Sequence, residues 1–331
     1  MIVRSLFVGA MMMFVNEFSY AQPVFSVWPH GEAPGASSST AQPQVVERSK
    51  DPSLPDRAVT GIRSPEITVY PAEKPNGMAL LITPGGSYQR VVLDKEGSDL
   101  APFFNQQGYT LFVMTYRMPG EGHKEGADAP LADAQRAIRT LRANAEKWHI
   151  NPQRIGIMGF SAGGHVAASL GTRFAQSVYP ATDAIDSVSA RPDFMVLMYP
   201  VISMQADIAH AGSRKQLIGE QPTEAQVIRY SPEKQVTAQT PPTFLVHAVD
   251  DPSVSIDNTL VMFSALRAKQ IPVEMHLFEK GKHGFGLRGT KGLPAAAWPQ
   301  LLDNWLRVLP VSKQRTVENR AIEGGATAQP K

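Results

Sequence analysis

Residues 154–168 read RIGIMGFSAGGHVAA, and they indicate the fold more strongly than any other stretch. The first half is a short apolar run, which is typical of a buried strand. The second half is rich in small residues that suit a helix. A G-x-S-x-G motif joins the two halves, with Gly159 and Gly163 on either side of Ser161. A sharp strand-to-helix turn needs neighbours without a Cβ and raises the serine hydroxyl above the sheet edge, so Ser161 is a candidate nucleophile.

The helix that begins after Ser161 adds a candidate oxyanion donor. The amide of Ala162 lies at its N-terminus and can donate to negative charge that develops on a substrate oxygen. Glycine and serine are common residues, and an ordinary tight turn with a solvated serine can have the same sequence. The nucleophile interpretation therefore requires a base, an acid and a second oxyanion donor elsewhere in the chain.

Composition excludes several classes of function. The 331 residues are long enough for one large α/β domain, and their net charge of +2 favours neither nucleic acid nor an anionic surface as a partner. No cysteine is present, which excludes disulfides, thiol catalysis and thiolate metal sites. The eight histidines are scattered, and no zinc-binding or nucleotide-binding motif occurs. We expect no metal and no cofactor.

The N-terminus is typical of a signal peptide. Arg4 precedes an apolar run at 6–15, and small residues precede Gln22, so cleavage is expected after Ala21. The run is too short to span a membrane as a helix. We therefore expect residues 1–21 to be removed and the mature protein to be secreted or periplasmic, with no membrane contact after cleavage.

The remaining chain divides into three parts. Residues 22–65 are rich in proline, serine and charge, and we expect an extended segment packed on the domain surface without its own core. Residues 66–310 are expected to form the α/β domain. Residues 311–331 are small and polar, which predicts a disordered tail.

Strands and helices alternate through the central part. Continuous apolar runs suit parallel strands that are covered on both faces, and their alternation with helices predicts a doubly wound, mostly parallel sheet with helices on both faces. Short helices within residues 201–241 are expected to form a small lid. The predicted strands are 67–70, 78–83, 110–117, 155–160, 193–200, 243–249 and 273–278.

A glycine-rich loop follows the second of these strands, with the sequence PGGSY at 84–88. Glycine lets a backbone approach a ligand closely, so this loop is a candidate second oxyanion donor. The amides of Gly86 and Ser87 are both candidates, and the sequence does not choose between them. Tyr88 is expected to border the substrate pocket, although a packing role is equally open.

The acid and the base follow Ser161 in the chain order that this kind of site requires. Each candidate comes just after a predicted strand, where parallel sheets place their ligands. Either Asp250 or Asp251 could be the acid. We choose Asp251 because it lies further into its loop, and expect Asp250 to cap the turn. His283 lies among glycines after the last strand and is the candidate base, whereas His247 lies inside a strand and is expected to pack.

Together these motifs resemble the α/β-hydrolase esterases of the acetylxylan esterase-like group. The resemblance implies a secreted serine esterase that removes acetyl groups from plant polysaccharides or oligosaccharides, with Ser161, Asp251 and His283 as its triad. Ser87 stands where relatives commonly have a third glycine, and Pro84 where lipase-like relatives have histidine. The resemblance covers about Trp28 to Leu309. Its motifs are WP at 28–29, APG at 33–35, PGGSY at 84–88, KEG at 95–97, YR at 116–117, GFSAGGH at 159–165, YPVIS at 199–203, DDP at 250–252 and HGFG at 283–286.

Other functions stay open. A carboxylesterase or feruloyl esterase would use the same triad with a larger acyl pocket. A peptidase shares the fold in longer proteins, and a non-catalytic carbohydrate-binding protein would need no triad. The expected partner is an acetylated carbohydrate or another small ester. The polysaccharide, the acetyl position and the oligomeric state are not determined by the sequence.

Overall fold

The structure is a computed structural model, and it describes residues 22–38 and 42–310. The expected signal peptide at 1–21 and the expected disordered tail at 311–331 lie outside the described residues. Within the described ranges, no helix combines the length and the apolar character needed to cross a membrane.

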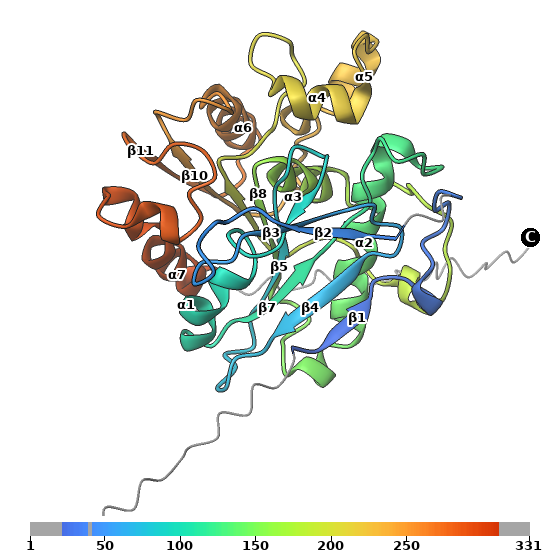
Figure 1. The fold of residues 1–331 in the computed structure, drawn as a ribbon, viewed down its shortest axis with the longest axis horizontal. Helices are drawn as coiled ribbons and strands as arrows, with labels where there is room; N and C mark the ends of the chain where they lie inside the picture. The colour runs from blue at the N-terminus through green and yellow to red at the C-terminus, as the bar shows by residue number, and fades with distance from the viewer. Residues whose placement is uncertain (1–21, 39–41, 311–331) are drawn as a thin grey trace, which may run out of the picture.

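An eight-stranded sheet forms the centre of the molecule, with the order β1-β4-β7-β5-β8-β9-β10-β11 (Figure 1). The strands from β7 to β11 are parallel, whereas β4 is antiparallel to both β7 and β1. The sheet confirms the predicted mostly parallel arrangement. Its strands are β1 (Val24–Ser26), β4 (Glu66–Tyr70), β5 (Ala79–Thr83), β7 (Thr110–Met114), β8 (Ile155–Phe160), β9 (Met195–Met198), β10 (Thr243–Ala248) and β11 (Val273–Phe278).

Helices cover both faces of this sheet and bury a separate apolar core on each (Figure 1). Strand β5 shows why, because Leu81 faces one core while Leu80 and Ile82 face the other. This alternation follows from the two-residue period of a strand. Helices α2 (Ala129–Ala143), α3 (Ala162–Arg173) and α6 (Asp257–Ala268) cover one face, and α1 (Ala101–Gln106) and α7 (Trp298–Val308) cover the other.

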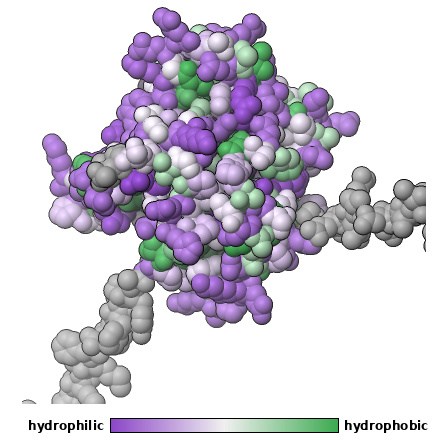
Figure 2. All heavy atoms as spheres, turned by 90° about the vertical axis from the view of Figure 1, so that its right-hand side faces the viewer, coloured by the Kyte–Doolittle hydropathy of each residue, from purple (hydrophilic) through white to green (hydrophobic). Residues whose placement is uncertain are grey.

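Two short helices, α4 (Ala211–Ile218) and α5 (Glu224–Arg229), follow β9 and lie at the upper edge of Figure 1. They occupy the segment that was expected to form a lid, and that role stays a prediction. The face drawn in Figure 2 is mostly hydrophilic, with small and separate apolar areas. The remaining helices are short 3₁₀ turns at Pro29–Gly31, Ser98–Leu100, Gly126–Asp128, Glu146–Trp148, Ala184–Ser187, Pro232–Lys234, Arg288–Thr290 and Pro294–Ala297.

The N-terminal segment contains strands that the sequence did not indicate. Strand β1 extends the main sheet by pairing with β4. Strands β2 (Gln44–Glu47) and β3 (Arg57–Thr60) form a second, three-stranded sheet with β6 (Val91–Val92). All four residues of β2 are exposed, so hydrophobic alternation could not have predicted it.

Trp28 packs the N-terminal segment against the domain. Its side chain is only 2% exposed, and its indole N–H donates to the Asp133 carboxylate over 2.8 Å. The same carboxylate accepts hydrogen bonds from the backbone and side chain of Arg117, which is fully buried. A buried ion pair needs such additional hydrogen bonds to offset its desolvation. Trp28 therefore connects the N-terminal segment to a charged cluster under helix α2.

Candidate active site

Ser161 occupies the turn between β8 and α3, with φ 53° and ψ −120°. An L-residue rarely adopts this conformation, and it persists only where the surroundings enforce it. Its N–H donates to the Met198 carbonyl, and its own carbonyl accepts from the Val201 N–H. A Cβ at Gly159 would overlap the Gly163 carbonyl, and one at Gly163 would overlap the carbonyls at the end of β5 and at the start of the following loop. Both flanking glycines are therefore sterically required, as the motif predicted.

A hydrogen-bonded chain connects Ser161 to His283 and Asp251. The Ser161 hydroxyl lies 2.9 Å from Nε2 of His283, and Nδ1 of the same ring lies 2.6 Å from Oδ2 of Asp251. The three residues follow β8, β11 and β10, whose carboxyl ends share one edge of the sheet. In the matching tautomer, the imidazole donates to the carboxylate and accepts from the hydroxyl. The arrangement can therefore remove the serine proton and stabilise the resulting imidazolium.

The geometry distinguishes the two neighbouring aspartates. Oδ1 of Asp251 accepts from the backbone N–H groups of Ser253 and Val254, which aims Oδ2 at His283. Oδ1 of Asp250 instead accepts from the N–H groups of Gly281 and Lys282. Asp250 therefore holds the loop that carries the histidine, and Asp251 is the carboxylate that reaches the imidazole.

His247 supports Asp251, although the sequence suggested only a packing role for it. Its Nε2 lies 3.2 Å from Oδ2 of Asp251, and its Nδ1 lies 2.7 Å from the Thr259 hydroxyl. Burial alone would raise the pKa of the Asp251 carboxyl. The hydrogen bonds from His247 and His283 outweigh burial and hold this pKa well below its usual range. Asp251 therefore stays charged. The signal in the sequence was a histidine four residues before the acid, on the strand that precedes its loop.

The PGGSY loop lies directly against the nucleophile. A Cβ at Gly85 would come within 2.9 Å of the Ser161 Cβ. The backbone is left-handed or glycine-like at three successive positions, with φ 140° at Gly86, 57° at Ser87 and 59° at Tyr88. Neither the Gly86 nor the Ser87 N–H has an acceptor among the described residues. Both amides are thus free to bind an oxyanion, as is that of Ala162 at the first position of α3.

Tyr88 faces the protein interior. Its side chain is 2% exposed, and its hydroxyl lies 2.6 Å from Nδ1 of His165. The other ring nitrogen of His165 lies 2.7 Å from the Tyr230 carbonyl oxygen. Burial lowers the pKa of His165 to about 4, so the ring is neutral and can accept from the tyrosine hydroxyl while it donates to the carbonyl. Tyr88 thus packs against His165 of α3. Its contact with substrate stays a prediction.

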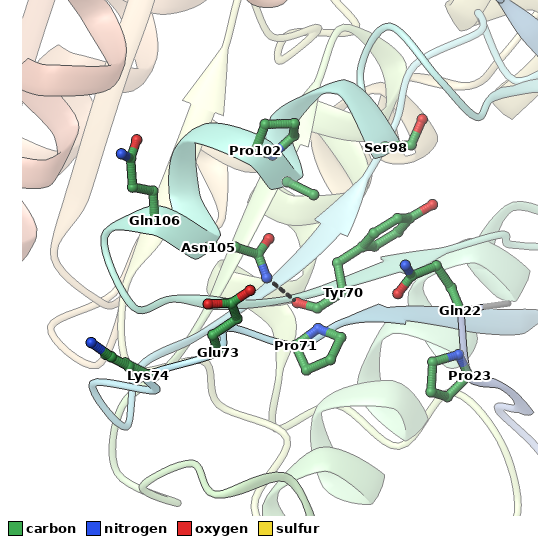
Figure 3. Close-up of a pocket in the computed structure, with 11 residues that line it drawn as sticks. Gln22, Pro23, Tyr70, Pro71, Glu73, Lys74, Ser98, Pro102, Asn105 and Gln106 are labelled. Atoms are coloured by element: carbon green, nitrogen blue, oxygen red, sulfur yellow. Dashed lines mark hydrogen bonds between the residues drawn. The ribbon is translucent and has the colours of Figure 1, made fainter. Parts of the chain in front are cut away.

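A separate cavity of about 1010 Å³ lies beside Tyr70 and α1 (Figure 3). Tyr70 pairs with Leu111 near the start of β7, so this cavity lies toward the amino ends of the parallel strands. The triad lies at their carboxyl ends and contributes no residue to it. Within the described ranges, no group of three potential metal ligands occurs.

Comparison with known proteins agrees with this architecture. The BD-FAE family model matches residues 70–266. The chain is 31% identical to an acetylxylan esterase from Xylanibacter ruminicola over 79% of its length. It spans 52% of that relative, about half of the longer protein.

Solved structures of ester hydrolases are also similar to this chain. The acetyl ester-xyloside bifunctional hydrolase from Caldicellulosiruptor lactoaceticus superposes with a TM-score of 0.71 at 34% identity, over 88% of this chain and 98% of that one. A carboxylesterase from Lactobacillus plantarum WCFS1 gives a TM-score of 0.61 at 25% identity, over 80% and 97%.

The doubly wound sheet, the strand-to-helix turn at Ser161 and the order serine, aspartate, histidine define an α/β hydrolase. Within that class, the chain belongs to the BD-FAE family. The resemblance to acetylxylan esterase-like hydrolases that the sequence motifs indicated is confirmed.

Proposed function

We propose that this protein is a serine esterase that hydrolyses acetyl esters of plant polysaccharides or their oligosaccharides. The single observation that carries the proposal is the chain of hydrogen bonds from Ser161 through His283 to Asp251 beside two free loop amides. The similarity to an acetylxylan esterase and to an acetyl ester-xyloside hydrolase supports acetylated xylan as the substrate class.

The reaction proceeds through two acyl-transfer steps. His283 takes the proton of the Ser161 hydroxyl as its oxygen attacks the ester carbonyl, and Asp251 stabilises the imidazolium. Amides of Ala162 and of Gly86 or Ser87 bind the oxyanion; loss of one such donor costs about 3 kcal/mol in the barrier. His283 then gives the proton to the departing sugar oxygen, which leaves an acetyl ester on Ser161. Water activated by the same imidazole releases acetate and restores the serine.

Acetate release from acetylated xylan tests this proposal. We expect the wild-type protein to release acetate and the Ser161→Ala variant to release none above background. Cleavage of p-nitrophenyl acetate through Ser161 without release from xylan would keep the serine mechanism and reject the xylan substrate. Failure of both reactions would reject the esterase and leave the non-catalytic carbohydrate-binding alternative, which a xylan-binding assay examines.

A carboxylesterase with a wider acyl preference is a second candidate, supported by the similarity to the Lactobacillus plantarum carboxylesterase. Activity on p-nitrophenyl esters from acetate to octanoate, and on methyl ferulate, separates the two. A steep loss beyond acetate favours the acetylesterase. A maximum at longer chains or on the ferulate favours the carboxylesterase or feruloyl esterase.

We also propose export of the protein, on the basis of the leader-like residues 1–21. N-terminal sequencing of the secreted or periplasmic fraction is expected to begin at Gln22. A protein retained in the cytoplasm with Met1 intact would contradict export without affecting the catalytic proposal.

A further inference from the structure

Glu96 is a buried carboxylate beside the active site with no cationic partner. It is 5% exposed, and no Lys, Arg or His side chain pairs with it among the described residues. Two hydrogen bonds offset its burial: Oε2 accepts from the Gly85 N–H over 2.8 Å, and Oε1 accepts from the Tyr199 hydroxyl over 2.9 Å. An unpaired charge is costly inside a protein unless hydrogen bonds satisfy it.

The first hydrogen bond fixes the peptide that precedes the oxyanion donors. Glu96 holds the N–H of the Pro84–Gly85 peptide, and the Tyr116 hydroxyl donates to its carbonyl oxygen over 2.6 Å. Tyr116 is fully buried. Because both polar groups of one planar peptide are bound to buried side chains, its orientation is determined. The next two N–H groups along the chain, of Gly86 and Ser87, are the candidate donors.

The second hydrogen bond extends from the same carboxylate to the loop of the base. The Tyr199 hydroxyl, which donates to Glu96, accepts from the Gly286 N–H over 3.1 Å. The Tyr199 ring packs edge-on against the His283 ring, with centroids 5.1 Å apart. The carboxylate therefore reaches the histidine loop through the Tyr199 hydroxyl and the PGGSY loop directly through the Gly85 N–H.

Tyr199 remains a donor in this arrangement. Burial raises the pKa of its phenol well above the usual range, and the Glu96 charge raises it further. Its backbone is held at φ 35°, another unfavourable conformation for an L-residue. The strained tyrosine and the unpaired glutamate thus support one another between the two loops.

We propose that Glu96 is a positioning residue that holds the oxyanion donors and His283 in the correct mutual geometry. This role rests on the proposed esterase function. Glu96 acts through Gly85 and Tyr199 and does not itself contact the reacting atoms. Its effect therefore belongs to the transition state, in which the oxyanion and the imidazolium exist together, and not to substrate binding in the ground state.

Glu96→Gln tests the role with the smallest change in shape. A glutamine has one acceptor oxygen and one NH₂ group, so it cannot accept a hydrogen bond at both of the positions that Oε1 and Oε2 of Glu96 occupy. We expect kcat for p-nitrophenyl acetate to fall about 10- to 100-fold with KM changed less than about twofold. Affinity for a trifluoromethyl ketone, whose adduct places an oxyanion in the same site, is expected to fall in parallel.

Asp99→Asn is the matched control. Asp99 lies three residues away, is partly buried, and pairs with Arg288 over 3.0 Å. Within the described residues, its side chain forms no hydrogen bond or ion pair with the PGGSY loop or the proposed triad. The kcat and the analogue affinity of this variant are therefore expected to remain at the wild-type level. Tyr199→Phe is the second test, because it removes the hydroxyl that joins Glu96 to the histidine loop while it retains the ring against His283.

Three outcomes would overturn the proposal: wild-type kcat in Glu96→Gln, a loss of activity with unchanged analogue affinity, or wild-type kcat in folded Tyr199→Phe. If Glu96→Gln does not fold, Tyr199→Phe decides, with a parallel fall in kcat and analogue affinity at unchanged Tm as the supporting result. Failure of the esterase proposal has a different signature, because the wild-type protein would then hydrolyse no ester.

Discussion

At the scale of single residues, Asp251 and its neighbours determine how the ring of His283, the proposed base, is oriented. One oxygen of the carboxylate accepts hydrogen bonds from two backbone N–H groups, and the other accepts hydrogen bonds from two histidine rings. A carboxylate bound in this way is fixed in direction as well as in charge. It can therefore hold the His283 ring in the tautomer that accepts the Ser161 proton.

His247→Gln is expected to lower kcat about 10-fold with little change in KM, since Asp251 would lose one hydrogen bond and some orientation. The comparison uses steady-state hydrolysis of p-nitrophenyl acetate. His276→Gln is the control, because His276 also lies in a strand but bonds to Glu274 near the surface. Equal kcat values for His247→Gln and the wild type would remove His247 from the catalytic arrangement.

The hydrogen-bonded arrangement of the proposed triad could be predicted because each member follows a recognisable strand. Ser161 lies in a motif whose glycines are sterically required, and His283 lies in a glycine-bounded loop. Glu96 and His247 could not be assigned these contacts in the same way. Tyr199 lies 103 residues from Glu96 along the chain. His247 lies inside a buried strand, where the sequence indicates only packing.

At the scale of elements, the N-terminal segment shows the limit of periodicity. Strand β1 has three residues, and β2 is exposed throughout. Both form because backbone groups at a sheet edge need partners, whereas their side chains carry no apolar alternation. The central strands were predictable for the opposite reason, since burial on both faces requires continuous apolar runs such as 79–83.

Trp28→Phe is expected to destabilise the protein by about 1.5–3 kcal/mol, because the buried Asp133 carboxylate would lose a hydrogen bond. Urea unfolding followed by tryptophan fluorescence and circular dichroism measures this loss. Val24→Ala, in β1 of the same segment, is the control because Val24 is 53% exposed. A Trp28→Phe variant as stable as the wild type would show that the segment contributes little to folding.

At the scale of the whole molecule, His165 couples stability to pH. Burial lowers the pKa of His165 in the folded protein to about 4, below the usual histidine value of about 6.5. Between these values the unfolded chain binds a proton that the folded protein excludes, so the free energy of unfolding falls as the pH falls. We expect the loss to begin below about pH 6.5, to be complete below about pH 4, and to amount to about 3 kcal/mol.

Chemical unfolding at pH 7 and pH 4 is the corresponding measurement. His165→Gln is expected to be less stable than the wild type at pH 7, because the hydrogen bonds to Tyr88 and Tyr230 are disturbed. It should nevertheless lose about 3 kcal/mol less between the two pH values. An unchanged pH dependence in the variant would assign the acid sensitivity to other groups.

The most direct test of the central claim is labelling with diethyl p-nitrophenyl phosphate, a reagent that phosphorylates activated serines. We expect one diethylphosphoryl group per chain, located on Ser161 by peptide mass spectrometry, with hydrolysis of p-nitrophenyl acetate lost in proportion to labelling. The His283→Ala variant should remain unlabelled under the same conditions, because its serine would have no base. Ester hydrolysis that persists after complete modification of Ser161, or a label on another residue that accounts for the lost activity, would contradict Ser161 as the nucleophile.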